Sequence, residues 1–209
     1  MPRCTATRST SSGTKGGSRR LTWTGSLVAA RSIGFPVVLK AVGLELVHKS
    51  DLGAVAVDLR DDADVRSSAA RIVKRLEKAR APSEGFVVQE FVKGGKETIL
   101  GMTRDKVFGP LLAFGLGGIY VEVLKDVSFG LAPITDADAL RMIQATRTYP
   151  LLQGIRGEKP SDVNALVDAL QRLSVLVTEL EEIQEVDLNP VAVLENGKGY
   201  RVLDARIVL

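Results

Sequence analysis

The sequence holds a single cysteine, Cys4, and a single histidine, His48. One cysteine cannot form an internal disulfide, and these two residues cannot build a Cys/His metal cluster. This composition fits a reducing compartment, and we expect a cytoplasmic protein. The lone histidine leaves three roles open, which are a surface side chain, a metal ligand and a group that does chemistry.

Long hydrophobic runs are also absent. The longest nearly apolar stretch, residues 111–124, is shorter than the roughly 20 residues that a membrane helix needs, and it carries Glu122. We therefore expect no membrane span. With 209 residues, 45% of them hydrophobic, the chain can build one large domain or two small subdomains.

Acidic residues are missing from the first 44 positions, which hold seven Lys and Arg residues. The rest of the chain has 21 basic and 25 acidic residues, so it is mildly acidic although the whole chain carries a net charge of +3. Aromatic residues make up 5% of the sequence, and no basic strip is laced with them. We therefore expect no binding to nucleic acid.

The first 25 residues combine Ser, Thr, Gly and Arg with almost no apolar periodicity. Such a segment cannot bury enough surface to offset its ordering entropy. We interpret residues 1–25 as a disordered or non-native tail and residues 26–209 as the folded domain. An acid-free, Arg-rich start also resembles an organellar transit peptide, but we find no amphipathic helix in it.

Hydrophobic periodicity in residues 26–209 predicts an α+β fold without regular βαβ alternation. The predicted strands are residues 37–42, 54–59, 86–91, 97–102, 111–115, 128–134, 185–194 and 200–209. The predicted helices are residues 26–32, residues 62–79, a helix that begins at Thr135, and residues 161–181. A capping-box pattern with Asp138 marks the start at Thr135. Two helices turn an apolar face inward, with Val65, Ala69, Ile72, Val73 and Leu76 in the first and Leu166, Leu170, Leu173 and Leu176 in the second.

Two features near the start of the domain could carry chemistry. The loop between the first two strands contains His48 in the stretch "ELVHKSDLGAV". Lys40 ends an otherwise apolar strand, so its side chain either extends to solvent or points into a cleft toward an anion.

A glycine-rich stretch, "FGLGGIYVEV", could bring backbone N–H groups close to phosphate oxygens through Gly115, Gly117 and Gly118. The stretch matches neither a P-loop nor the dinucleotide-binding GxGxxG pattern, because Tyr120 occupies the last glycine position. A plain tight turn is the alternative interpretation.

Carboxylates supply the remaining candidates. Glu90 and Glu97 flank a Gly-Gly turn, where a solvated hairpin is the alternative to a binding role. Asp187, Asn189 and Asp204 fall on neighbouring strands of a terminal hairpin. Converging carboxylate and amide oxygens suit Mg²⁺, while the alternative is a turn with a charge at a strand end.

The candidate residues fall within eight sequence blocks that occur in this order: "GFPVVLK", "HKSDLGAV", "VVQEFVKGGKETILGM", "FGP", "FGLGGIYVEVLKDVSFGLAPI", "PLLQGIRG", "EVDLNP" and "LDARIVL". The series resembles the ATP-grasp domain of ADP-forming acyl-CoA synthetases, over about residues 26–209. The resemblance implies two α+β subdomains with a nucleotide between them. It also implies that the N-terminal part of the domain is truncated, because residues 1–25 do not match the family.

The same resemblance implies roles for individual residues. The implied nucleotide contacts are Lys40 to a phosphate, Glu90, Phe91 and Val92 to adenine, Glu97 to the ribose, and Gly115, Gly117 and Gly118 to phosphate oxygens. Asn189 and Asp204 match Mg²⁺ ligands of the related succinyl-CoA synthetase β chain. Asp187 matches an acidic residue that faces a phosphohistidine there, and His48 matches the phosphoryl carrier of the HKSD motif. Ala54 stands where the family usually has a second glycine.

The implied reaction is acyl-CoA + ADP + phosphate ⇌ acid + CoA + ATP, through an acyl phosphate and phosphohistidines. ATP and ADP would be substrates and Mg²⁺ the cofactor. This chain would perform the nucleotide half, and a CoA-binding α subunit or domain would bind the acid and CoA, which implies a hetero-oligomer. The alternatives are the ATP-grasp part of a fused synthetase, a ligand-sensing domain of a protein lysine acetyltransferase, and a non-catalytic fragment.

Overall fold

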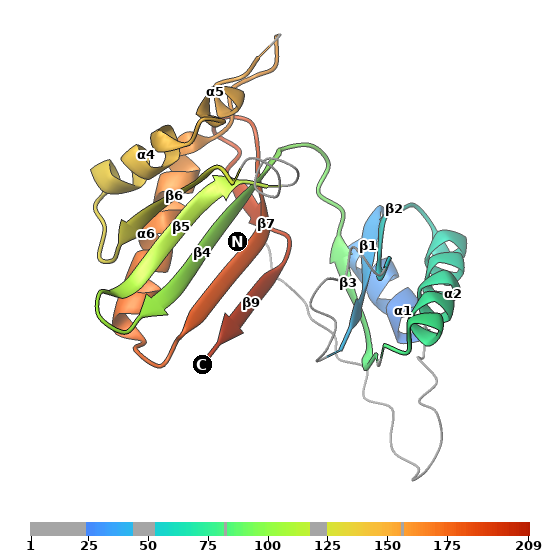
Figure 1. Ribbon diagram of the computed structural model, residues 1–209. Coiled ribbons are helices and arrows are strands. Elements are labelled where there is room, and N and C mark those ends of the chain that lie inside the picture. Colours follow the sequence, from blue (N-terminus) through green and yellow to red (C-terminus); the bar gives the residue numbers. More distant parts are fainter. Residues whose placement is uncertain (1–23, 44–52, 82, 118–124, 156) are drawn as a thin grey trace. The chain divides into compact units, whose positions relative to one another are not determined.

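The computed structural model of the chain describes residues 24–43, 53–81, 83–117, 125–155 and 157–209 (Figure 1). The chain divides into two compact units, Met1–Phe91 and Val92–Leu209, here called unit 1 and unit 2. His48 and Gly118 lie outside the described residues. Within the described ranges, no helix is long and apolar enough to cross a membrane.

Unit 1 is a three-stranded antiparallel sheet with two helices. The strand order is β2-β1-β3, and β1 pairs with both neighbours. The elements are α1 (Thr24–Ile33), β1 (Val37–Val42), β2 (Val55–Leu59), α2 (Asp62–Ala79) and β3 (Gly85–Glu90). The bounds predicted for β1 and α2 are confirmed, and β2 begins one residue later than predicted.

Helix α2 has clear start and stop signals in its sequence. The Asp61 side chain accepts a hydrogen bond from the N–H of Asp64 at 2.8 Å, which caps the first turn. The helix ends where Arg80 adopts a left-handed conformation, with φ at 53°. The predicted inward residues are buried except Val73, which is half-buried; Ser68 completes the buried stripe instead.

The apolar core of unit 1 lies between its helices and one face of its sheet. Alternate residues of β1, namely Val37, Leu39 and Ala41, are fully buried in this core. Because successive side chains of a strand point to opposite faces, Val38 and Lys40 lie on the face of the sheet away from the helices.

Unit 2 is a six-stranded antiparallel sheet in the order β6-β5-β4-β7-β8. The sixth strand, β9, also pairs with β7, along the first half of β7, while β8 pairs with its last residues. Its strands are β4 (Lys96–Asp105), β5 (Gly109–Leu116), β6 (Val127–Leu131), β7 (Glu185–Val193), β8 (Tyr200–Val202) and β9 (Ala205–Val208). Its helices are α4 (Asp136–Ala145), α5 (Tyr149–Leu152) and α6 (Val163–Glu179). The predicted α+β fold is confirmed.

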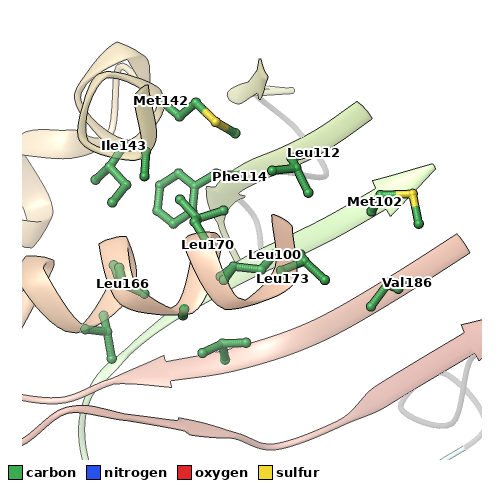
Figure 2. Close-up of a cluster of buried hydrophobic side chains, with 14 of the residues drawn as sticks. Leu100, Met102, Leu112, Phe114, Met142, Ile143, Leu166, Leu170, Leu173 and Val186 are labelled. Carbon is green, nitrogen blue, oxygen red and sulfur yellow. The ribbon is translucent and has the colours of Figure 1, made fainter. Parts of the chain in front are cut away.

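The core of unit 2 packs α4 and α6 against one face of the sheet (Figure 2). Phe114 of β5 is fully buried, and Leu170 of α6 belongs to the same cluster. Leu100 and Met102 of β4 add alternate side chains from the neighbouring strand. This period of two leaves the opposite face of the sheet uncovered by α4 and α6.

The start of α4 is confirmed as a capping box. The N–H of Thr135 donates to the Asp138 carboxylate at 2.9 Å, and the N–H of Asp138 donates to the Thr135 hydroxyl at 3.3 Å. The Thr135 hydroxyl also donates to the Asp138 carboxylate at 2.6 Å, and this bond, with the Thr135 N–H and the nearby Arg141, holds the pKa of Asp138 at about 2. The carboxylate is therefore ionised near neutral pH, where it accepts a hydrogen bond from the backbone N–H of the N-cap residue Thr135.

The inward face predicted for α6 is wrong at one position. Leu166, Leu170 and Leu173 are buried, but Leu176 is 37% exposed and Val177 is fully buried. The observed spacing of four, three and four residues keeps the stripe on one side of the helix, and Leu176 lies beside it. The helix is also shorter than predicted, from Val163 to Glu179, because Asp162 caps its first turn.

The single terminal strand predicted at residues 200–209 is two strands. β8 and β9 are separated by Leu203 and Asp204, so Asp204 lies between strands. Opposite this break stands Pro190, which has no N–H to donate to the ladder. Its carbonyl oxygen instead accepts a hydrogen bond from the N–H of Leu203 at 2.9 Å.

Candidate functional site

Three predicted site residues of unit 2, Glu97, Gly115 and Asp187, lie on the face of its sheet opposite α4 and α6, which we call the open face. It carries Glu97, Ile99, Gly101, Ala113, Gly115, Val127, Phe129, Glu185, Asp187 and Arg206, as the strand alternation and pairing register place them. In the central row, Gly101 stands between Ala113 on β5 and Asp187 on β7. Small residues therefore line the middle of the open face, and charged residues line its β7 side.

The predicted metal ligands are adjacent in the structure. Asn189 of β7 donates its backbone N–H to the carbonyl oxygen of Asp204 at 3.2 Å. Asp187 lies two residues before Asn189 and pairs with Arg206 of β9. The prediction that these three residues lie on neighbouring segments of the terminal hairpin is confirmed, with the correction that Asp204 belongs to no strand.

Negative charge is concentrated around Asp187. Partial burial raises the pKa of its carboxyl group, and the nearby carboxylates of Glu185 and Asp204 raise it further, while Arg206 acts in the opposite direction. The part of the shift that comes from Glu185 and Asp204 reflects like charges that an added cation would offset. The acidic side of the open face is therefore suited to a hard divalent ion beside Asn189 and Asp204.

The protein would supply only part of such an ion's coordination shell. Among the described residues, no group of three or more His, Cys, Asp and Glu side chains could hold a metal by itself. Mg²⁺ is usually held by one or two carboxylates, together with water and substrate phosphates. One carboxylate and one amide thus fit a metal that arrives with a nucleotide.

The glycine-rich strand end packs tightly against Glu97. The N–H of Gly117 donates to the backbone oxygen of Glu97 at 2.7 Å. A Cβ added at Gly117 would lie 3.1 Å from the Cβ of Glu97, which is closer than most such contacts. Gly115 is buried between Ile99 and Val127 in the same sheet. The structure thus brings Glu97, Gly115 and Gly117 together at one end of the open face.

Lys40 is the predicted phosphate-binding cation of unit 1. It lies on the central strand between Val55 of β2 and Val87 of β3. The residue is only 9% exposed, which argues against a lysine that simply extends into solvent. Of the two alternatives for Lys40, a side chain directed at an anion agrees better with this burial.

The predicted adenine-binding segment, Glu90 to Val92, coincides with the boundary between the units. Glu90 is the last residue of β3, and the N–H of Phe91 donates to the backbone oxygen of Pro36 at 3.1 Å. Unit 2 begins at Val92. The alternative of one solvated hairpin is wrong, because Glu90 ends a strand of one sheet and Glu97 lies in a strand of another.

One hollow of unit 2 lies away from these residues. It has a volume of about 410 Å³ and runs along β6 and α4, where it is lined by Phe129, Leu131, Arg141 and Met142 among others. None of the residues predicted to bind nucleotide or metal lines it. This hollow is therefore not the predicted site.

Sequence reasoning missed one buried carboxylate, that of Asp126. It accepts hydrogen bonds from the N–H of Arg147 at 2.9 Å and from the N–H and hydroxyl of Thr148 at 2.8 and 2.5 Å. Burial alone would raise the pKa of this group, but the three bonds outweigh it and hold the pKa below its usual value. No local pattern could have revealed this, because the partners lie more than 20 residues further along the chain.

Comparison with known proteins identifies the family of the chain. Residues 22–209 match the family described as ATP-grasp domain. The chain is 52% identical over 183 residues to an ADP-forming 4-hydroxybutyrate–CoA ligase of Nitrosopumilus maritimus, covering 87% of this chain but 26% of that protein. It is 42% identical over 179 residues to the β subunit of ADP-forming acetate–CoA ligase I of Pyrococcus furiosus, covering 85% of this chain and 76% of that subunit.

Solved structures give the same result. The fold matches acetyl-coenzyme A synthetase 1 of Ca. Korarchaeum cryptofilum, in complex with coenzyme A, Ca-AMPCP and HgCl⁺, with a TM-score of 0.85 and 45% identity over 91% of this chain and 84% of that one. It also matches a form of that enzyme in complex with coenzyme A and Mg-AMPPCP, in which the phosphohistidine segment points towards the nucleotide binding site. This match has a TM-score of 0.76 and 44% identity, and it covers 91% of this chain and 84% of that one.

The resemblance predicted from eight sequence blocks is thereby confirmed. The chain spans about a quarter of the length of the longer ligase that it matches and about three quarters of the separate β subunit. Its family makes it a nucleotide-binding domain. The chain belongs to the ATP-grasp domains of the ADP-forming acetyl- and acyl-CoA synthetases, of the β-subunit type.

Proposed function

We propose that this chain performs the nucleotide half of an ADP-forming acyl-CoA synthetase, acyl-CoA + ADP + phosphate ⇌ acid + CoA + ATP. The observation that carries the proposal is the grouping of Glu97, Gly115 and Asp187 on the open face, with Gly117 bonded to Glu97 and Asp204 bonded to Asn189. This face combines small residues near a sheet end with acidic ligands on one side. Such a surface suits a flat base and ribose followed by a metal-bound polyphosphate.

We assign nucleotide contacts to residues of each unit separately. Glu97 would accept hydrogen bonds from the ribose hydroxyls, and backbone groups at Gly115 and Gly117 would allow close approach of phosphates. The segment from Glu90 to Val92 would contact the adenine edge. Lys40 would neutralise a phosphate, and its burial favours this because a desolvated cation attracts an anion more strongly.

Mg²⁺ would be held by the side-chain oxygens of Asn189 and Asp204. When bound, the ion would neutralise phosphate charge that develops as the phosphoryl group is transferred. The backbones of Asn189 and Asp204 are joined by a hydrogen bond, so their side chains leave adjacent positions and can bind the same ion. The raised pKa of Asp187 supports the same location for positive charge.

His48 would carry the phosphoryl group. In the ATP-consuming direction, a nitrogen of the neutral imidazole attacks the γ-phosphorus, an N–P bond forms, and the P–O bond to ADP breaks. The phosphoryl group then passes to the acyl-transfer half of the enzyme, and the imidazole is regenerated. Asp187 matches the acidic residue that faces a phosphohistidine in the related succinyl-CoA synthetase β chain, and we assign it the role of stabilising the positive charge that the ring acquires.

A CoA-binding α subunit or domain would complete the enzyme and would bind CoA and the acid. The P. furiosus relative supports a separate partner, because it is itself a β subunit of similar length. The longer N. maritimus relative favours a second arrangement, in which this domain is one part of a fused synthetase. Both arrangements leave the proposed chemistry of this chain unchanged.

The proposal is tested by phosphoryl transfer from γ-labelled ATP with Mg²⁺, with and without the CoA-binding partner. We expect an acid-labile, base-stable label on the wild-type chain that disappears in His48→Ala and falls sharply in Asp204→Ala. Asp168→Ala is the matched control, because Asp168 is an exposed carboxylate on α6 that pairs with Arg172. Label retained in His48→Ala would overturn the carrier role.

A further inference from the structure

Lys125 has a backbone conformation that its residue type does not explain. Its φ is 49°, in the left-handed region. Among the described residues, two other non-glycine residues share this region, Asp58 and Arg80. Arg80 closes a helix, and aspartate tolerates this conformation well, so both have ordinary reasons. Lysine at such a position is strained, and such strain is often found at functional sites.

Asp126 holds this conformation in place. Its buried carboxylate is anchored by the three hydrogen bonds from Arg147 and Thr148. On the other side, the N–H of Val127 donates to the backbone oxygen of Lys125 at 3.0 Å. Lys125 thus precedes a residue that cannot shift without losing three bonds, and its own backbone is fixed while its side chain is exposed.

The position of Lys125 is at the glycine-rich end of the open face. Val127 pairs with Gly115, so Lys125 and Gly117 are each two residues from that pair, at the same end of the sheet. Two residues of chain reach no further than about 7 Å, so Lys125 stays close to the strand end that Gly117 occupies. Glu97 is bonded to Gly117 at this end.

The charge of Lys125 lies at the end of the sheet that Glu97 occupies, where Arg147 is also close enough to Asp126 to help lower the pKa of its carboxyl group. Lys96, the other lysine near this end, donates to Glu158 at 2.5 Å. Among the residues that the structure describes, no carboxylate forms an ion pair with Lys125. Glu97 and Asp187 would leave a polyphosphate on this face in an acidic setting unless a cation offset them.

We propose that Lys125 is a phosphate-binding residue of unit 2, which contacts the terminal phosphates of a bound nucleoside di- or triphosphate, and that Asp126 is its positioning residue. The proposal rests on the proposed function, because it deepens the description of the same nucleotide site. It assigns unit 2 a cation of its own, in addition to Lys40 of unit 1. The strain at Lys125 is then the cost of presenting an ammonium group beside Gly117.

Substitution of Lys125 by glycine distinguishes phosphate binding from a purely structural role. Glycine adopts positive φ freely, so Lys125→Gly relieves the strain while it removes the charge. We expect its melting temperature to stay at or above that of the wild type. Its affinity for ADP with Mg²⁺ should fall by roughly tenfold to a hundredfold, as expected for one charge-assisted hydrogen bond. Affinity for AMP should change much less, because AMP lacks the terminal phosphates.

Three further single variants and one double variant test the assignment with the full chain in titration calorimetry. Lys125→Arg should keep most of the ADP affinity, and Lys106→Gly, in the turn at the other end of β4 and β5, should leave it unchanged. Asp126→Asn should weaken ADP binding, and adding it to Lys125→Gly should cause no further loss, because Asp126 acts through Lys125.

Unchanged ADP affinity in Lys125→Gly, with wild-type protein that binds ADP, would overturn the role of Lys125 and leave the proposed function standing. Equal weakening of AMP and ADP would also overturn it. A wild-type chain that binds no ADP at all would overturn the proposed function and this inference together.

Discussion

The backbone N–H of Asn189 lies 3.2 Å from the backbone oxygen of Asp204, and this hydrogen bond joins two residues that are 15 positions apart in the sequence. It holds the two predicted metal ligands side by side although Asp204 lies in a break between strands. The bond joins main-chain atoms, so substitution of either side chain leaves it available. Side-chain variants can therefore test metal binding without removing this contact.

Asp204→Asn should weaken metal-dependent nucleotide binding selectively. The substitution keeps the shape of the side chain but removes the negative charge that attracts Mg²⁺. We expect the affinity for ADP to fall by about tenfold with Mg²⁺ present and to change little in the presence of a chelator. Equilibrium titration under both conditions measures the difference. Equal weakening in the two conditions would show that Asp204 contacts the nucleotide by another route.

Local patterns were sufficient to predict the elements whose signals lie within a few residues. The bounds of α2 were predicted from its apolar stripe, and the start of α4 from Thr135 and Asp138. Elements that depend on distant partners were predicted less well. The break between β8 and β9 is set opposite Pro190, which is more than ten residues earlier in the chain.

In the candidate site too, features with local sequence signals could be predicted, and features that depend on distant residues could not. The terminal hairpin could be predicted from its two strands, so the adjacency of Asn189 and Asp204 was foreseeable. The placement of Glu90 and Glu97 in different sheets was not, since a Gly-Gly sequence between two strands also fits a hairpin. Asp126 could not be identified at all, because its burial and its bonds to Thr148 exist only in the folded chain.

Gly117→Ala should lower both stability and nucleotide affinity. The added methyl group would meet the Cβ of Glu97 at 3.1 Å and its carbonyl carbon at 3.3 Å, so the strand end must shift. We expect a loss of about 1 to 3 kcal/mol, typical of overpacking. Gly101→Ala is the matched control, because its methyl group would meet its nearest neighbour at 3.4 Å. Thermal unfolding of the two variants should therefore show the larger decrease for Gly117→Ala.

Arg104→Met should destabilise unit 2 through the end of α6. The Arg104 guanidinium donates to the backbone oxygens of Val177 at 2.7 Å, Ile183 at 2.8 Å and Leu180 at 3.3 Å. These oxygens lie at or just after the helix end, where carbonyl groups lack partners within the helix. We expect a loss of about 2 kcal/mol in the free energy of unfolding, measured by urea titration.

A matched arginine tests whether this loss comes from the helix end. Arg172 pairs with Asp168 on the exposed side of α6, and such a pair contributes about 0.5 kcal/mol or less. Arg172→Met should therefore leave the urea midpoint almost unchanged. Similar losses in both variants would mean that the bonds of Arg104 to the three carbonyl oxygens add little.

Asp138→Asn should reduce the sensitivity of the chain to acid. The pKa of Asp138 in the folded chain is about 2, below its usual value of 3.8, because Thr135 and Arg141 favour the ionised form. Since the folded pKa is the lower one, the stabilisation is fully present above about pH 4 and is lost as the pH falls towards 2. Unfolding measured across this window should show a steeper acid loss for the wild type than for the variant. Parallel curves would show that the capping box does not depend on the charge of Asp138.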